Sequence, residues 1–451
     1  MPMPNDLADL DAIAARDMMA RGDLAAVSYV GALLERIAER EPEIGAFVHL
    51  QPQSALAQAE ACDARRASGD QIGSLHGVAV AIKDIVDTSD LPTENGTPLD
   101  AGRRPAEDAV VVARLKEAGA VILGKTVTTE LGARHPGGTR NPHHREHTPG
   151  GSSSGSAAAV GARMAPLAIG TQTNGSVIRP ASFCGVVGFK PSFGLIPRTG
   201  ILPQAPPLDT AGVFARSVPD AALIVDALAG YDPRDRATRA LARPHLLDTA
   251  LTEPPATPSL AFVKTMSWDL AEVDTQAGFA DLIGKLADRC EEVPLTDRIE
   301  DSDQVLMTLT NVGIARTYGP YHDRGAGQLS DFMRTMIEDS RTIPAVDYLD
   351  ALDRQAEIKA ELDHLFERYD AIVTPAAPGA APHGLESTGN SAFNNLWSLC
   401  GLPAITLPLL ESANGLPIGV QLVGRHGEDG ELLRTARWLQ SYIADRSAWR
   451  R

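Results

Sequence analysis

Lys83 and two turns rich in Gly and Ser are the residues of this sequence best suited to chemistry. Lys83 follows the apolar run 77–82, and the turns lie at 150–156 and 171–176. Burying an ammonium is costly, so its pKa falls and the lysine can act as a base near neutral pH. Small residues in the turns let backbone N–H groups face an oxyanion. Together they indicate a Ser–Lys nucleophile set, although ordinary turns and a lysine paired with Asp84 or Asp87 stay open.

Two short patterns in the same region match catalytic motifs only by their letters. Residues 119–126 match the P-loop, but their middle is Ala-Val-Ile-Leu, which is typical of a strand in a sheet. Residues 151–155 match the nucleophile elbow, but a turn at 147–150 precedes them where an apolar strand is required. We interpret the first as a buried strand that ends in a Gly turn, and the second as a Gly/Ser turn.

Four histidines within 13 residues raise the question of a metal site. They are His135, His143, His144 and His147. The spacing of His143 and His147 suits zinc on a helix, but Pro and Gly at 136–142 disfavour a helix there, and Glu146 is the one close carboxylate. The segment therefore predicts polar loop histidines and no metal.

The pattern of elements around these residues predicts an α/β fold. The apolar run 77–82 is typical of a central strand covered on both faces, and 108–118 and 120–123 read as the next helix and strand. The segment 148–215 has very few charged residues and many small ones, which indicates closely packed, buried backbone. The other predicted helices are 5–20, 24–40, 54–67, 157–163, 345–369 and 428–442, and the other predicted strands are 370–375 and 403–408. The second of these helices is expected to stop near Pro42.

Composition limits the possible partners and compartment. The chain has 451 residues and a net charge of −17, with 41 basic and 58 acidic residues, so nucleic acid and anionic membrane are disfavoured partners. The four cysteines form no paired motif, and no secretory signal or apolar stretch of membrane-spanning length is visible. We expect a cytoplasmic protein with reduced thiols.

Longer motifs spread over most of the chain resemble the amidase signature family. The resemblance begins at Gly77-Val-Ala-Val-Ala-Ile-Lys83 and is centred on Thr148-Pro-Gly-Gly-Ser152-Ser-Ser-Gly. It continues through Gly170-Thr-Gln-Thr-Asn-Gly-Ser176 to Pro191, and then through Gly401-Leu-Pro-Ala-Ile-Thr-Leu-Pro408 and 415–424. A motif that exceeds 40 residues is far more specific than the short patterns above.

This resemblance implies both a fold and a catalytic set. The fold is an α/β/α domain on one large, twisted mixed sheet over 1–451, with a helical segment at about 1–70, a signature core at about 73–215 and a variable substrate-pocket region at about 235–400. Ser176 matches the nucleophile, Ser152 the bridging serine after a cis peptide at Gly151, and Lys83 the general base. The oxyanion would be held by backbone N–H groups of residues 173–176, namely Thr173, Asn174, Gly175 and Ser176. No metal or organic cofactor is implied.

The chain departs from the common family pattern beside the nucleophile. Asn174 replaces a Gly, which places a side chain next to the expected oxyanion hole. Arg179 follows Ser176 by three residues instead of two. It could bind a substrate carboxylate, but we expect it to pair with a buried acid such as Asp209, because buried charges are normally paired. Arg179, Thr128 and Gly151 are the candidates for substrate contact, and Tyr318, Tyr321, Phe332 and Trp397 are aromatic side chains for a pocket or the core.

Two functions follow from the resemblance. The main interpretation is a stand-alone amidase that hydrolyses the carbon–nitrogen bond of a small, linear, non-peptide amide through an acyl-enzyme on Ser176. Its partner would be the small-molecule amide, with a homodimer as the default oligomer. The alternative is the A subunit of a tRNA-dependent amidotransferase, which hydrolyses the amide of glutamine or asparagine within a complex.

Overall fold

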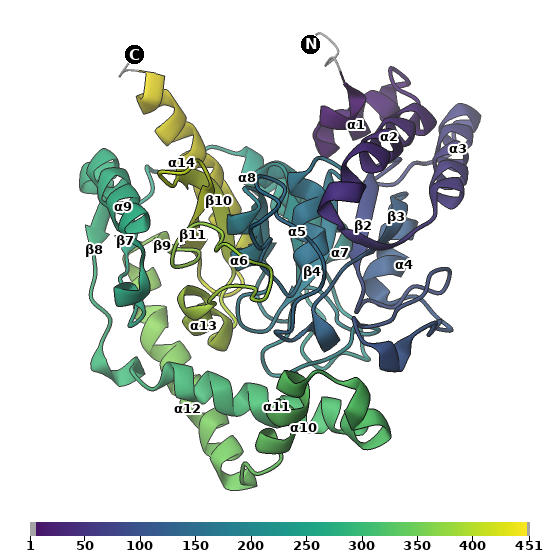
Figure 1. Cartoon of the computed structure of the whole chain (residues 1–451). Helices are drawn as coiled ribbons and strands as arrows, with labels where there is room; N and C mark the ends of the chain where they lie inside the picture. The colour runs from purple at the N-terminus through teal and green to yellow at the C-terminus, as the bar shows by residue number, and fades with distance from the viewer. Residues whose placement is uncertain (1–5, 449–451) are drawn as a thin grey trace.

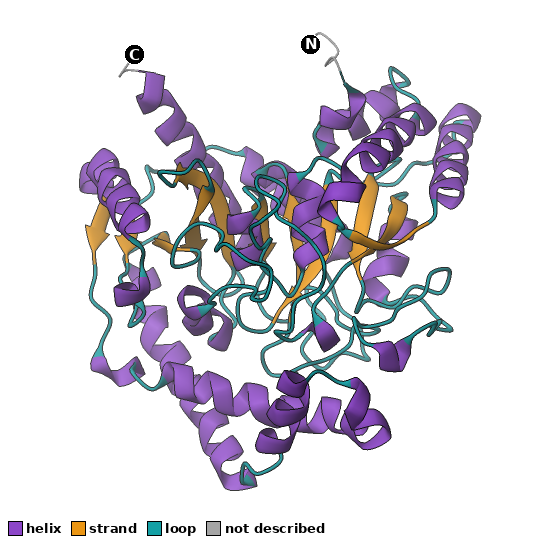
Figure 2. Cartoon of the chain, in the orientation of Figure 1, coloured by secondary structure: helices purple, strands orange, loops and turns teal. Residues whose placement is uncertain are grey.

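A mixed sheet of 11 strands runs through the centre of the molecule (Figure 1, Figure 2). The structure is a computed structural model and is described for residues 6–448. The strand order of the sheet is β1-β3-β2-β4-β6-β5-β10-β11-β9-β7-β8. The strands are β1 Phe47–Leu50, β2 Ala79–Lys83, β3 Val121–Thr126, β4 Leu167–Gln172, β5 Val187–Lys190, β6 Thr210–Ala215, β7 Leu260–Phe262, β8 Cys290–Glu292, β9 Ala371–Pro375, β10 Ala404–Glu411 and β11 Pro417–Val423.

The sheet is mixed because it contains two groups of parallel strands, whereas its middle and one edge pair are antiparallel. β2 runs parallel to β3 and to β4, and β7 runs parallel to β8 and to β9. The pairs from β4 through β6, β5, β10 and β11 to β9 are antiparallel, and so is the edge pair β1–β3. This arrangement confirms the predicted α/β fold on one large mixed sheet.

Lys83 is carried by one of the most enclosed strands. All five residues of β2 are buried, and β3 and β4 flank it on its two sides. The apolar run before Lys83 therefore has no solvent-facing side, as its composition predicts. β2 ends at Lys83, which pairs in register with Thr126 of β3.

Helices cover the sheet in two groups. α5 and α6 contact each other, α5 packs on β2 and β4, and α6 packs on β5, β10 and β11. α4, α7, α8 and α14 form a second contiguous group, in which α7 and α14 lie against the sheet. The helices are α1 Ala12–Arg21, α2 Ala26–Ile44, α3 Pro52–Ser68, α4 Val110–Glu117, α5 Ser154–Gly161, α6 Ile178–Phe183, α7 Val218–Leu228, α8 Leu246–Leu251, α9 Val273–Leu286, α10 Ser302–Gly325, α11 Asp331–Ser340, α12 Ala345–Asp363, α13 Ala392–Leu399 and α14 Asp429–Ala448.

α10, α11 and α12 form a helical unit between β8 and β9. They lie together below the sheet in the view of Figure 1, and α10 also contacts α13. α10 thereby brings residues 302–325 to the part of the molecule that contains Ser176. No helix within residues 6–448 is both long enough and apolar enough to cross a lipid bilayer.

Several predicted helices differ in their bounds from the observed ones: α5 begins at Ser154 where residue 157 is predicted, and α14 extends to Ala448, past the predicted end at 442. α2 continues past Pro42 to Ile44 and ends where Gly45 takes a φ of 63°, because the glycine accepts the left-handed conformation and its N–H bonds to Glu41 O. The helix predicted over 345–369 ends at Asp363 and continues as a short 3-10 turn. The helix predicted over 5–20 begins at a residue outside the described ones, and within the described part it is a 3-10 turn at Leu7–Asp9 followed by α1.

Candidate active site

Lys83 is a fully buried lysine with two hydroxyl partners. Its Nζ lies 2.7 Å from Ser152 Oγ and 2.8 Å from Thr171 Oγ1. Burial lowers the pKa of Lys83 from 10.5 to about 7, and the nearby charge of Asp209 opposes this shift. A large fraction of Lys83 is therefore neutral at neutral pH, and its lone pair can accept a proton from a hydroxyl group. The alternative of an ion pair between Lys83 and Asp84 is not realised, because Asp84 pairs with Lys125 at 3.2 Å.

The Ser152 backbone is held by two residues that follow β3. The peptide bond between Gly151 and Ser152 is cis, as the resemblance implies. The Ser152 carbonyl accepts hydrogen bonds from Thr128 Oγ1 at 3.2 Å and from the Thr129 N–H at 3.3 Å. Its side chain is buried and directed at Lys83. Thr128, a predicted substrate contact, therefore positions the Ser152 backbone.

Ser176 and the loop before it connect β4 to α6. Within residues 6–448 the Ser176 hydroxyl makes no hydrogen bond, and neither do the backbone N–H groups of Thr173, Asn174, Gly175 and Ser176. The next two N–H groups, of Val177 and Ile178, both donate to Gln172 Oε1, at 2.8 and 3.0 Å. The loop thus presents a run of free donors next to a free hydroxyl, which is the donor set that an oxyanion requires.

Residues of α13 support this loop from more than 200 positions away. Ser398 donates to the carbonyl of Asn174, and Gln172 Nε2 donates to Ser398 Oγ at 3.0 Å. Gly175 packs against Asn394 so closely that a Cβ at position 175 would collide with Asn394 Oδ1. The sequence patterns do not single out Thr171, Asn394 or Ser398 as residues that support the site. Thr171 lies within the matched motif and could have been found there, whereas no local pattern indicates that α13 reaches the loop.

A small cavity opens directly over the Ser176 loop. Its volume is about 30 Å³, and residues 173–176 line it together with Arg134 and Arg179. α10 contributes Met307, Thr310, Asn311 and Ile314, and Met336 of α11 and Ser391 complete the wall. Arg134 and Arg179 are the charged residues that line this inner cavity. A wider outer cavity of about 540 Å³ shares Arg134, Arg179 and Ser391 with it.

Arg179 does not form the predicted ion pair with Asp209. Its Nη2 donates to the Gly151 carbonyl at 2.6 Å and to Thr388 Oγ1 at 3.2 Å, and within residues 6–448 it has no carboxylate partner. Asp209 is instead held by Thr173 Oγ1 at 2.6 Å and by the N–H groups of Gln204 and Ala205. The prediction fails because these neutral donors already saturate Asp209. Gly151, another predicted substrate contact, serves as the acceptor for Arg179.

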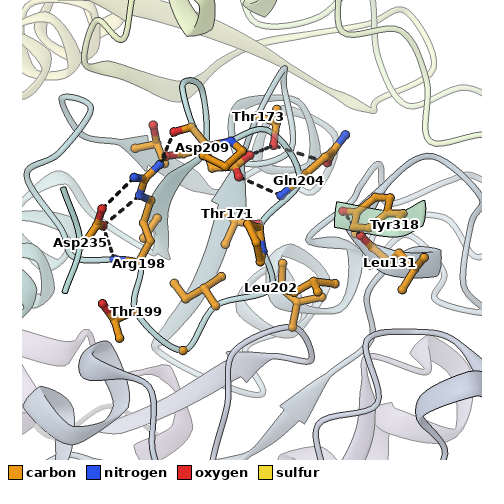
Figure 3. A pocket seen from close by; sticks show the side chains of 18 of the residues that line it. Leu131, Thr171, Thr173, Arg198, Thr199, Leu202, Gln204, Asp209, Asp235 and Tyr318 are labelled. Atoms are coloured by element: carbon orange, nitrogen blue, oxygen red, sulfur yellow. Dashed lines mark hydrogen bonds and ion pairs between the residues drawn. The ribbon is translucent and has the colours of Figure 1, made fainter. Parts of the chain in front are cut away.

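A third cavity, of about 280 Å³, lies beside Thr171 and Thr173 (Figure 3). Thr171 and Thr173 line it, and the hydrogen bonds of Asp209 to Thr173 and Gln204 cross its wall. Tyr318 reaches the same wall and donates to the Leu131 carbonyl at 2.6 Å. Gln204 and Thr173 separate this cavity from the inner one, since they line both.

The other predicted aromatic side chains have different roles. Phe332 lines the outer cavity, and Trp397 is fully buried in the core. Tyr321 donates to Asp100 at 2.7 Å. None of these three lines the inner cavity over Ser176.

The short patterns and the histidine cluster have structural roles. Residues 121–126 form the buried strand β3, as expected for a false P-loop. Ser153 of the apparent elbow is fully buried and donates to the Thr171 carbonyl at 3.3 Å. His143 and His147 bond to the carbonyls of Cys184 and Ala381. Within residues 6–448 no three His, Cys, Asp or Glu side chains gather as metal ligands.

Comparison with known proteins places this geometry in a family. The model of the amidase family matches residues 28–433. A curated relative from Roseiflexus castenholzii, the A subunit of glutamyl-tRNA(Gln) amidotransferase, is 35% identical over 93% of both chains. A solved structure, described as a vestigial protein complex that reveals the origins of an s-triazine catabolic enzyme, has a TM-score of 0.90 at 27% identity and covers 96% of this chain and 98% of its own. The native peptide amidase from Stenotrophomonas maltophilia has a TM-score of 0.83 at 28% identity and covers 98% of both chains.

These findings correct the predicted function and the predicted partners. The main interpretation, a stand-alone amidase for small linear amides, is wrong, because relatives with 32–35% identity over 92–96% of the chain are named as the A subunit of an amidotransferase. The prediction of a small-molecule partner with a default homodimer is wrong for the same reason, since that name describes a component of a larger enzyme. The amidase type of enzyme is retained. On its motifs, its fold and a match over residues 28–433, the chain belongs to the amidase signature family.

Proposed function

We propose that the chain is the amide-hydrolysing A subunit of a multi-component amidotransferase, with Ser176 as nucleophile, Ser152 as proton relay and Lys83 as general base. Identity of 35% to such a protein, over 93% of both chains, supports the assembly. The 2.7 Å contact between Lys83 Nζ and Ser152 Oγ carries the chemistry. The substrate is the side-chain amide of glutamine or asparagine, and a partner protein holds the tRNA.

The first half of the reaction forms an acyl-enzyme. Neutral Lys83 takes the proton of Ser152, Ser152 takes that of Ser176, and Ser176 Oγ attacks the amide carbonyl carbon. The negative charge that develops on the carbonyl oxygen is stabilised by the free N–H groups of residues 173–176. The carbon–nitrogen bond then breaks, and the proton returns through Ser152 to the leaving nitrogen.

The second half releases the acid. A water molecule attacks the acyl carbon, Ser152 and Lys83 accept its proton, and Ser176 leaves with a proton restored to its oxygen. The products are ammonia and a carboxylate, and the assembled enzyme then uses the ammonia. This sequence needs a lysine that is neutral at working pH, and a pKa of about 7 supports that requirement.

The test compares the isolated chain with its native assembly. A tagged chain is purified from its own cells, the complex is separated by size exclusion, and ammonia release from glutamine and asparagine is measured for both forms. We expect the complex to be at least about tenfold more active than the chain alone, and Ser176→Ala to remove activity from both. Full activity of a partner-free chain contradicts its assignment as a subunit. Activity of the Ser176→Ala complex close to that of the unmodified complex contradicts the nucleophile.

A further inference from the structure

Arg179 is a buried cation that lacks an anion. Its side chain is 5% exposed, and its hydrogen bonds go to two neutral oxygens, of Gly151 and Thr388, through Nη2 alone. Nε is buried without a partner, and Nη1 makes no hydrogen bond within residues 6–448. Burial lowers the pKa of Arg179 to about 9, and the neighbouring Arg134 acts in the same direction. Burying a charged guanidinium without a counter-ion destabilises the folded protein, and a bound anion would offset this cost.

Arg179 lies in the wall of the cavity that contains Ser176. Arg179 lines both the inner cavity and the outer one, and its Nη2 contacts the carbonyl of Gly151, the residue before Ser152. Arg134 is exposed, makes no ion pair or hydrogen bond within residues 6–448, and lines the same two cavities. Two guanidinium groups without an anionic partner within residues 6–448 therefore line both cavities, at the junction between them.

The acidic side chains around this junction do not neutralise the positive charge of the two arginines. No Asp or Glu lines the inner cavity. Glu386 lines the outer cavity, where it is exposed and accepts from the Leu385 N–H at 3.0 Å. The junction therefore attracts an anion. An ammonium group of a substrate has no carboxylate partner there close to Ser176.

We infer that the active site selects its amide through a carboxylate on the acyl part of the substrate, which Arg179 and Arg134 hold, and not through an ammonium group. This inference rests on the proposed function. Arg179 Nη1 is the donor left for that carboxylate, and hydrogen bonds between charged groups are stronger than those between neutral groups. Glutamine and asparagine carry this carboxylate, but half-amides of dicarboxylic acids carry it without an ammonium. Both groups of compounds are therefore substrates.

The first experiment measures binding and needs no turnover. Glutarate is titrated calorimetrically into the Ser176→Ala chain and into the same chain with Arg179→Gln, Arg179→Lys, Arg134→Gln or Arg145→Gln. We expect Arg179→Gln to weaken glutarate binding by about 100-fold or more, and Arg179→Lys to retain part of it, since lysine keeps the charge but not the planar fork. Arg134 is exposed, so its replacement is tolerated in folding, and we expect Arg134→Gln to weaken glutarate binding by about tenfold. Arg145, exposed and outside both cavities, is the matched control with no expected effect.

The second experiment measures hydrolysis by the assembled enzyme. Three amides of equal chain length are compared: glutamine, glutaramate (which lacks the ammonium) and pentanamide (which also lacks the carboxylate). We expect glutaramate to be hydrolysed at least as well as glutamine, and Arg179→Gln to raise KM for these two amides by a much larger factor than KM for pentanamide. Glutarate binding that is independent of Arg179 and Arg134, or a strong preference for glutamine over glutaramate, overturns the inference. Intact glutarate binding without turnover contradicts the proposed function alone.

Discussion

Replacing Lys83 by Met tests whether the active site is maintained at the expense of stability. The pKa of Lys83 falls from 10.5 to about 7 because the ammonium is buried, so folding opposes protonation. Between about pH 7 and pH 10.5 the unfolded chain therefore binds more protons at Lys83 than the folded chain does. Stability of the unmodified protein therefore rises with pH across this window, and below it the full penalty is present.

The size of the effect follows from the shift. Each pKa unit is worth about 1.4 kcal/mol, so the lysine costs the folded state about 4 kcal/mol at pH 7 and about 2 kcal/mol at pH 9. Met has a similar length and no charge, and it leaves Ser152 and Thr171 without their 2.7 and 2.8 Å partner, which costs about 1–2 kcal/mol each. That loss does not depend on pH. We expect the stability of Lys83→Met relative to the unmodified chain to fall by about 2 kcal/mol from pH 7 to pH 9.

Urea unfolding followed by circular dichroism at the two pH values measures this difference. Lys116→Met is the control: burial acts against its ammonium, but Asp108 and Asp90 raise its pKa above 10.5, so it is charged in both states at either pH. The relative stability of the control is expected to be the same at pH 7 and pH 9. A Lys83→Met difference that is also the same at both pH values refutes the argument, because it shows that Lys83 is charged in the folded protein. Amide hydrolysis by Lys83→Met is expected to be lost in either case.

Three other outcomes concern the reaction in the assembled enzyme. Ser176→Ala is expected to lower turnover by at least about 10³-fold with an unchanged circular dichroism spectrum, and initial rates within tenfold of the unmodified enzyme exclude Ser176 as nucleophile. Gly175→Ala forces a Cβ against Asn394 Oδ1 and displaces the N–H donors, so kcat is expected to fall by about 10²-fold, and an unchanged kcat argues against this oxyanion loop. A profile of kcat/KM against pH is expected to fall about tenfold per unit below pH 7 and to level off above it, since neutral Lys83 is the base, and a flat profile between about pH 5 and about 9 contradicts that role.

The sequence predicted those strands and turns that a short stretch of neighbouring residues specifies. An apolar run with no polar face can be stable only between two covered neighbours, and β2 occupies that position between β3 and β4. The Gly-rich turns around Ser152 and Ser176 were recognisable because loops that approach other backbone closely require small residues at fixed spacing. The end of α2 was misplaced, because a proline in the last turn removes a single hydrogen bond and Gly45 provides the actual stop.

The contacts that complete the site have no such local signal. Asn394 and Ser398 reach the Ser176 loop from α13, and α10 and α11 supply the opposite wall of the inner cavity. These segments are separated from Ser176 by more than 100 residues, so their approach depends on how the whole sheet and the α10–α12 unit pack. The motifs likewise could not decide between a stand-alone amidase and the A subunit of an amidotransferase, because both interpretations rest on the same family motifs.

The sequence by itself determined which groups are available for chemistry and how far apart they lie along the chain: Lys83, the hydroxyl groups of Ser152 and Ser176, and a run of small residues with free N–H groups. The tertiary structure alone decided the state of those groups. Burial lowers the pKa of Lys83 to about 7, and Arg179 has no anionic partner within residues 6–448 because Asp209 is already satisfied by neutral donors. The energy of a charge depends on the polarity and the partners of its surroundings, and packing sets both.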